Sequence, residues 1–144
     1  MGDVLILLTK ETLNPQKITE SVQQASNGAI TTFLGTTRDI SLGRPVLNLE
    51  YEAYVEMAER ELEKIVQAVR QKWGITDVSI AHRFGKVGIG EISLVVAVGS
   101  VHRAEGFAAC QYIVDQIKET VPIWKKEVFT DGEIWIDKNH PSTP

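Results

Sequence analysis

The chain has 144 residues, of which 43% are hydrophobic and 24% charged, and its net charge is -4 at pH 7. This length and composition fit one globular domain with a sizeable core, so we treat residues 1–144 as a single domain. The acidic balance argues against a general nucleic-acid binder, which would carry a basic face. No apolar run is long enough to span a membrane, and a single cysteine excludes an internal disulfide.

The first apolar stretch, residues 4–8, has no basic region before it. It is therefore predicted to be the start of a strand and not the core of a signal peptide. Together with the single cysteine, this favours a cytoplasmic protein.

Apolar spacing and turn residues predict the secondary structure along the rest of the chain. The clearest helix covers residues 58–73, where apolar residues recur every three or four positions and Gly74 follows. Two further helices are predicted over 15–25 and 103–118. Strands are predicted over 3–9, 29–37, 46–54, 76–84, 92–98, 124–129 and 133–137. This order predicts an α+β domain with a mixed, largely antiparallel sheet.

Two stretches between the predicted strands are interpreted as irregular. Residues 39–45 contain Gly43 and Pro45 and are predicted to form a mobile loop, a candidate lid. Gly85, Gly88 and Gly90 are predicted to form a turn. Their spacing does not match a phosphate-binding fingerprint, and a strand follows them instead of a helix.

Two lysines lie seven residues apart on either side of Pro122. Because Pro122 lacks an amide hydrogen and disfavours helical angles at Val121, we expect Lys118 in the last turn of a helix and Lys125 on an extended segment. A bend there would bring two ammonium groups toward one pocket. Such a pair is useful where an anion is neutralised or an amine must lose its proton. The plainer alternative is two solvated lysines.

A second cationic feature opens the predicted helix over residues 103–118. Free amides and the positive end of the helix dipole, together with His102 and Arg103, would form an anion site there. Ser100 would be the helix cap. The alternative is that Ser100 caps the helix and Arg103 only pairs with Glu105.

Further polar residues lie on or beside the predicted strands. Arg38 follows a strand directly and is a candidate phosphate or carboxylate clamp, or a partner of Asp39 or Glu50. His82 and Arg83 are neighbours on one strand and should point to opposite faces, one into the core or an interface and the other outside.

The remaining candidates are structural. Cys110 lies on the apolar stripe of its helix and is predicted to be a buried, protonated thiol. The three histidines are scattered at positions 82, 102 and 140, with no cysteine or carboxylate at ligand spacing. A metal site is therefore not predicted. No other cofactor is expected.

Five motifs follow one another along the chain. They are G-A-I-T-T-F-L-G-T-T-R (28–38), L-E-Y-E-A-Y-V-E-M-A (49–58), H-R-F-G (82–85), S-V-H-R-A-E-G-F-A-A (100–109) and V-P-I-W-K-K-E (121–127). In this order they resemble the large, catalytic subunit of molybdopterin synthase, from the molybdenum cofactor pathway. The resemblance extends over residues 28–136 and implies an α/β hammerhead with a small additional β-subdomain.

The resemblance also implies an activity and partners. Members of that family are sulfurtransferases that convert cyclic pyranopterin monophosphate into molybdopterin by installing two sulfurs as a dithiolene. The sulfur arrives as a thiocarboxylate on the C-terminal Gly-Gly of a small ubiquitin-like subunit. The large subunit forms a central homodimer with one small subunit at each end, a heterotetramer.

Carried over to this sequence, the family pattern makes Lys118 and Lys125 the catalytic residues. It implies a substrate-binding role for Phe33, Arg38, His102, Arg103 and Glu127. The tail departs from some relatives, because Lys138 is its nearest cation where they place an arginine. Residues 138–144 are expected to be frayed.

Two other functions remain open from the sequence. A non-catalytic module that binds a pterin or nucleotide phosphate would use Arg38, His102 and Arg103 without needing both lysines. An interaction scaffold would only dock a ubiquitin-like protein.

Overall fold

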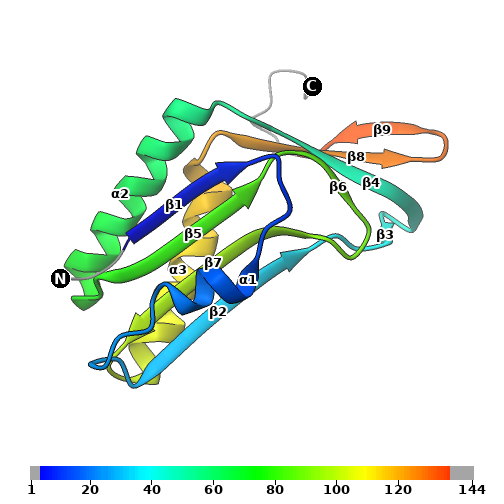
Figure 1. Cartoon of the computed structure of the whole chain (residues 1–144). Helices are drawn as coiled ribbons and strands as arrows, with labels where there is room; N and C mark the ends of the chain where they lie inside the picture. The colour runs from blue at the N-terminus through cyan, green and yellow to red at the C-terminus, as the bar shows by residue number, and fades with distance from the viewer. Residues whose placement is uncertain (1–3, 137–144) are drawn as a thin grey trace.

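The computed structural model describes residues 4–136, which form two β-sheets and three helices (Figure 1). The first sheet has the order β1-β5-β7-β2 and consists of β1 (Val4–Thr9), β5 (Asp77–Arg83), β7 (Ile92–Ser100) and β2 (Ala29–Thr36). The second has the order β3-β4-β8-β9 and consists of β3 (Ile40–Ser41), β4 (Arg44–Ala53), β8 (Ile123–Phe129) and β9 (Gly132–Trp135), with β6 (Gly85–Gly88) paired to β4. The helices are α1 (Pro15–Glu20), α2 (Val55–Trp73) and α3 (Arg103–Thr120).

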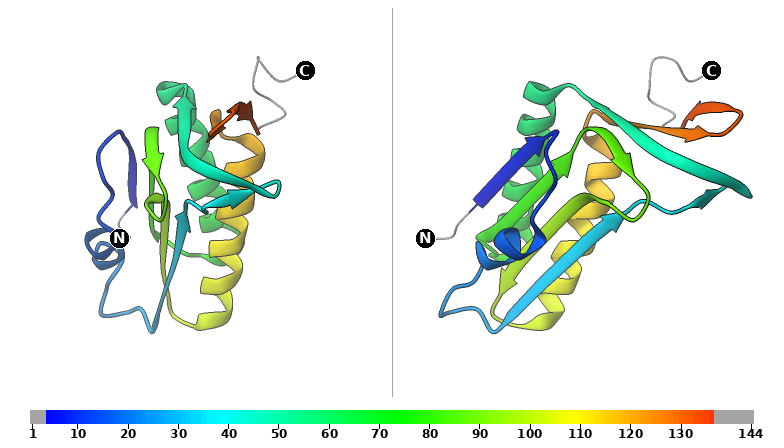
Figure 2. Two further views of the ribbon diagram at one scale, coloured as in Figure 1. Left: turned by 90° about the vertical axis from the view of Figure 1, so that its right-hand side faces the viewer. Right: turned by 45° about the vertical axis from the view of Figure 1, so that its right-hand side comes forward.

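The predicted fold class is confirmed. Strands β1 and β5 are parallel, and the other strand pairs of both sheets are antiparallel. Helices α2 and α3 cover one face of the first sheet, and α1 lies on the other (Figure 2). The second sheet projects beyond the end of the first (Figure 1) and is the additional β-subdomain.

Strand β7 lies in the centre of the first sheet and is apolar on both faces, as its sequence predicts. Val96 and Val98 pack in the main core with α2 and α3, while Val95 and Ala97 pack in a smaller core with α1. Because both faces are covered, the strand needs no polar side.

Helix α2 has the predicted amphipathic pattern and begins at Val55, three residues before the predicted start. Its buried residues are Ala58, Leu62, Ile65, Val66 and Val69. Gly74 ends the helix with φ 68°, and its amide donates to the carbonyl of Arg70.

Both segments predicted to be irregular contain strands, so these predictions were wrong. Residues 39–45 form β3 and the start of β4, joined by a tight turn in which Leu42 has φ 54° and Gly43 has φ 72°. Left-handed angles at two successive residues suit a hairpin turn, but leucine does not signal them. The predicted glycine turn contains β6, whose Val87 is fully buried.

Two smaller predictions also differ from the structure. Helix α1 ends at Glu20, five residues early; the Ser21 hydroxyl bonds to the Ile18 carbonyl, the kind of local bond that competes with helix continuation. Arg83 is not outside, because its side chain is only 13% exposed and lies beside Glu91.

Some predictions lie outside the described residues. These are the first residue of the N-terminal strand, Asp3, the last residue of the final predicted strand, Asp137, and the tail over 138–144 with Lys138 and His140. No helix described within residues 4–136 is long and apolar enough to cross a membrane.

His82 is confirmed as a core residue and should make stability depend on pH. Its side chain is buried, its Nδ1 lies 2.8 Å from the Arg83 carbonyl oxygen, and its ring packs edge-on against Tyr51. Burial lowers the pKa of His82 from 6.5 to about 4. The unfolded chain therefore takes up this proton at a higher pH than the folded chain, and stability is lost as pH falls below 6.5.

We predict that the titration of His82 lowers the free energy of unfolding by about 1.5 kcal/mol between pH 6.5 and pH 5. Urea unfolding of the wild type and of His82→Gln at both pH values measures this, since the variant lacks the titrating ring. An equal loss of stability in both proteins would show that His82 is not the titrating group.

Candidate functional site

Pro122 lies in the break between α3, which ends at Thr120, and β8, which starts at Ile123, as the sequence predicts. Val121 caps the helix with extended angles, φ -84° and ψ 129°, and its amide still donates to the Ile117 carbonyl. The Pro122 carbonyl accepts a hydrogen bond of 3.1 Å from the Tyr54 amide, which fixes the bend against the start of α2. Lys118 is consequently in the last turn of α3, and Lys125 is on β8.

Three charged residues lie around Lys125: Lys118, Arg38 and Glu127. We call the three cations, Lys118, Lys125 and Arg38, the lysine cluster. Burial lowers the pKa of the Lys125 ammonium, and the nearby cations Lys118 and Arg38 lower it further, while the Glu127 carboxylate opposes them by raising it. Effects of this kind require charges close to one another. The structure therefore brings together four of the seven predicted site residues.

The register of β4 and β8 determines what surrounds Lys125. Lys125 and Glu127 are two residues apart on β8 and share one face, and Tyr51 of β4 lies directly opposite Lys125. The buried Glu127 carboxylate accepts a 2.7 Å hydrogen bond from the Ser41 hydroxyl. The Tyr51 hydroxyl donates to Ser93, and burial is the main cause that raises the pKa of Tyr51. One polar wall of this site is thus held by side chains from four strands, β3, β4, β7 and β8.

The other predicted cations lie at the opposite end of α3. His102 is the N-cap, and its amide donates to Glu105 at 2.9 Å. Ser100 is therefore not the cap, although its hydroxyl donates to the His102 carbonyl at 2.7 Å. Both His102 and Arg103 are exposed. At 1.5 Å per residue, Arg103 is about 22 Å along the helix axis from Lys118, so one chain does not join the two cationic groups.

Phe33 lies between these two ends. It is in the middle of β2, paired with Val96 of β7, and is partly buried against the main core. Strand β2 starts opposite Ser100 and ends two residues before Arg38. Phe33 therefore lies on the strand that runs from the one cationic region toward the other.

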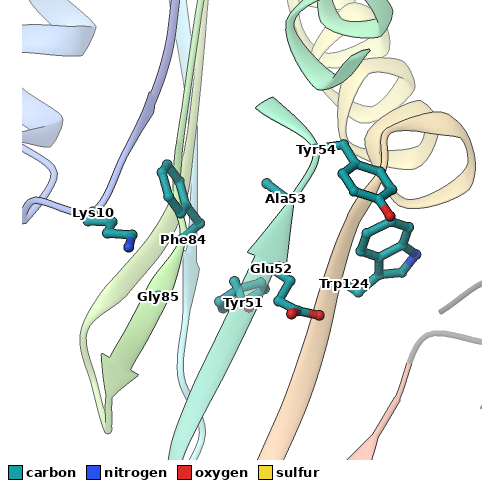
Figure 3. Close-up of a pocket in the computed structure, with 8 residues that line it drawn as sticks. All are labelled: Lys10, Tyr51, Glu52, Ala53, Tyr54, Phe84, Gly85 and Trp124. Atoms are coloured by element: carbon teal, nitrogen blue, oxygen red, sulfur yellow. The ribbon is translucent and has the colours of Figure 1, made fainter. Parts of the chain in front are cut away.

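A pocket of about 320 Å³ lies between β4, Trp124 and the start of β6 (Figure 3). It is lined by Lys10, Tyr51, Glu52, Ala53, Tyr54, Phe84, Gly85 and Trp124. None of these was a predicted site residue. The lining comes from four segments far apart in the sequence, so no local motif indicates it. Trp124 precedes Lys125, and strand alternation turns their side chains to opposite faces.

The structural role predicted for Cys110 agrees with its surroundings. The thiol is buried, and burial raises its pKa to about 11, which keeps it protonated at neutral pH. Within residues 4–136, no group of three or more histidine, cysteine or acidic side chains is arranged to hold a metal ion.

The fold and the lysine cluster define an α+β protein whose cations, gathered where a long helix ends, suit an anionic ligand. The MoaE protein family model matches residues 8–120, and the chain belongs to that family.

The relatives in sequence and in structure are named as molybdopterin synthase or its catalytic subunit. The chain is 52% identical over 119 residues to the molybdopterin synthase catalytic subunit of Arabidopsis thaliana, covering 83% of this chain and 60% of that relative. A crystal structure of molybdopterin synthase from Staphylococcus aureus superposes with a TM-score of 0.86 at 38% identity, covering 90% of this chain and 94% of the other.

A solved structure with lower sequence identity shows only that the fold is shared. It belongs to a complex of subunits 1 and 2 of the molybdopterin-converting factor from Helicobacter pylori, and the TM-score is 0.74 at 20% identity, covering 98% of this chain and 93% of that chain.

Proposed function

We propose that this chain is the catalytic subunit of a cytoplasmic molybdopterin synthase. It would transfer sulfur from the C-terminal thiocarboxylate of a small ubiquitin-like subunit to cyclic pyranopterin monophosphate. Two such transfers would form the dithiolene of molybdopterin. Family membership supports this assignment, as does the name that the relatives share.

The observation that carries the proposal is the convergence of Lys118, Lys125 and Arg38 near one buried carboxylate. Both proposed reactants are anions, one through its phosphate and the other through its thiocarboxylate. Three cations held together repel one another, and an anion bound among them relieves that repulsion.

Each lysine has a separate role in this proposal. Lys118 is exposed at the end of α3, where it can neutralise the arriving thiocarboxylate and the oxyanion that forms as sulfur leaves it. Lys125 has a lowered pKa, so it gives up a proton more easily than an ordinary lysine. It would exchange protons as the cyclic phosphate opens and oxygen is lost.

The phosphate site requires a second chain. His102 and Arg103 are too far along α3 to reach the lysines of their own chain, but a homodimer mate could present them. Two large apolar side chains near them favour an interface there, since Val101 is 55% exposed and Phe107 is 62% exposed. We therefore propose a homodimer whose sites are shared, with one small subunit at each end.

Replacing Lys118 or Lys125 with alanine should lower dithiolene formation by about 100-fold or more, because each removes a charge that acts on the reacting groups. The assay mixes the purified chain with thiocarboxylated small subunit and the cyclic precursor. Circular dichroism should show an intact fold. Lys126→Ala is the matched control, since Lys126 pairs with Glu50 and Glu133 on the other face of β8.

Near-normal turnover in both alanine variants would remove the catalytic assignment. Phosphate-ligand binding by the wild type without conversion would instead identify a binding module. Formation of a complex with the small subunit, and nothing else, would identify a scaffold.

The shared site predicts complementation between two inactive variants. Random mixing of Arg103→Ala chains with Lys118→Ala chains makes half of the dimers mixed, and each mixed dimer has one intact site. Activity should therefore recover to about a quarter of the wild-type value. No recovery after unfolding and refolding the two chains together would show that each site is built from one chain.

A further inference from the structure

The β3–β4 hairpin is attached to the strands that carry the site. Arg44 stacks on Phe129 of β8, with its guanidinium carbon 3.9 Å from the ring centroid, and pairs with Asp131 in the β8–β9 turn. Ser41 bonds to Glu127 further along β8. The hairpin thus forms one ordered edge of the second sheet (Figure 1).

The hydrogen bond from Ser41 ends on Glu127, the carboxylate next to the lysine cluster. The Ser41 hydroxyl donates to Glu127 Oε1 at 2.7 Å, and Glu127 is only 5% exposed. A buried carboxylate depends on such a donor, because it has little water to replace it. Ser41 and Glu127 are 86 residues apart in the sequence, so the tertiary fold alone creates this bond.

Glu127 is close to Lys125 without forming a contact ion pair. The carboxylate raises the pKa of the Lys125 ammonium from the same face of β8, yet the ion pairs within residues 4–136 do not include Lys125. The other groups that face Lys125 are Lys118 from α3, Arg38 after β2 and Tyr51 from β4. Glu127 is the one carboxylate among these neighbours.

We propose that Ser41 is a positioning residue, whose hydroxyl holds the Glu127 carboxylate beside Lys125 and prevents the two from closing into an ion pair. The Lys125 ammonium then stays available to a substrate. This inference rests on the function proposed above. Without the hydroxyl, the buried carboxylate lacks its donor, and the cation two residues away on the same face becomes its best replacement partner.

The direct test measures the pKa of Lys125 in the isolated chain, without pterin or small subunit. Only a neutral amine reacts with acetic anhydride, so the pH dependence of Lys125 acetylation, followed by peptide mass spectrometry, reports its pKa. Ser41→Ala should raise this pKa by about half a unit or more, because an ion pair favours the charged form. Glu127→Gln should lower it, because it removes the negative charge that raises the pKa of Lys125.

Two controls separate this role from general support of the hairpin. Ser41→Thr keeps the hydroxyl and should leave the pKa of Lys125 unchanged. Arg44→Ala removes the stacking and the ion pair at the other side of the hairpin but leaves Ser41 in place, so it should also leave the pKa unchanged. A Lys125 pKa in folded Ser41→Ala equal to that of the wild type would overturn the proposal, as would the same rise in Arg44→Ala.

Turnover provides an independent readout. Dithiolene formation by Ser41→Ala should fall by about 10-fold at pH 7.5, and any decline of kcat at alkaline pH should move to higher pH in step with the pKa of Lys125. If Lys118→Ala and Lys125→Ala stay active while Ser41→Ala raises the pKa of Lys125, the proposed function fails and the positioning role stands. If both lysine variants are inactive while Ser41→Ala leaves the pKa of Lys125 unmoved, the positioning role fails alone.

Discussion

Electrostatic repulsion among neighbouring cations is the constraint on which this site depends. The break at Pro122 turns the chain from α3 into β8, which sets Lys125 close to Lys118, and the end of β2 adds Arg38. Partial burial of Lys125 makes its positive charge still less favourable. The rest of the fold must therefore offset the free-energy cost of this repulsion, and a bound anion reduces that cost.

The sheets hold the charges in place. Strand β8 is paired along its length with β4, which orients Lys125 and Glu127 on one face, and the β3–β4 hairpin returns to secure Glu127 through Ser41. Helix α3 holds His102 and Arg103 away from these charges, because a straight helix of 18 residues keeps its two ends apart. One chain thus contains two separated cationic regions, and a shared site in a dimer would unite them.

Periodicity and the proline allowed much of this to be predicted from the sequence. The apolar spacing in α2, the two-sided apolar run of β7 and the break before Lys125 are local signals, and each was confirmed. The β3–β4 hairpin was missed because Leu42 adopts a left-handed angle that leucine rarely takes, and β6 because its glycines resemble a turn. The Ser41–Glu127 bond and the separation of Arg103 from Lys118 depend on tertiary geometry, which no local pattern encodes.

Titration of the protein with inorganic phosphate, followed by NMR of the lysine side-chain ammonium groups, tests the anion site most directly. The account predicts that the signals of Lys118 and Lys125 shift together along one binding curve. It also predicts that the pKa of Lys125 rises on saturation, because the bound anion offsets the neighbouring cations. Saturating phosphate that leaves both lysine signals and the pKa of Lys125 unchanged would contradict it.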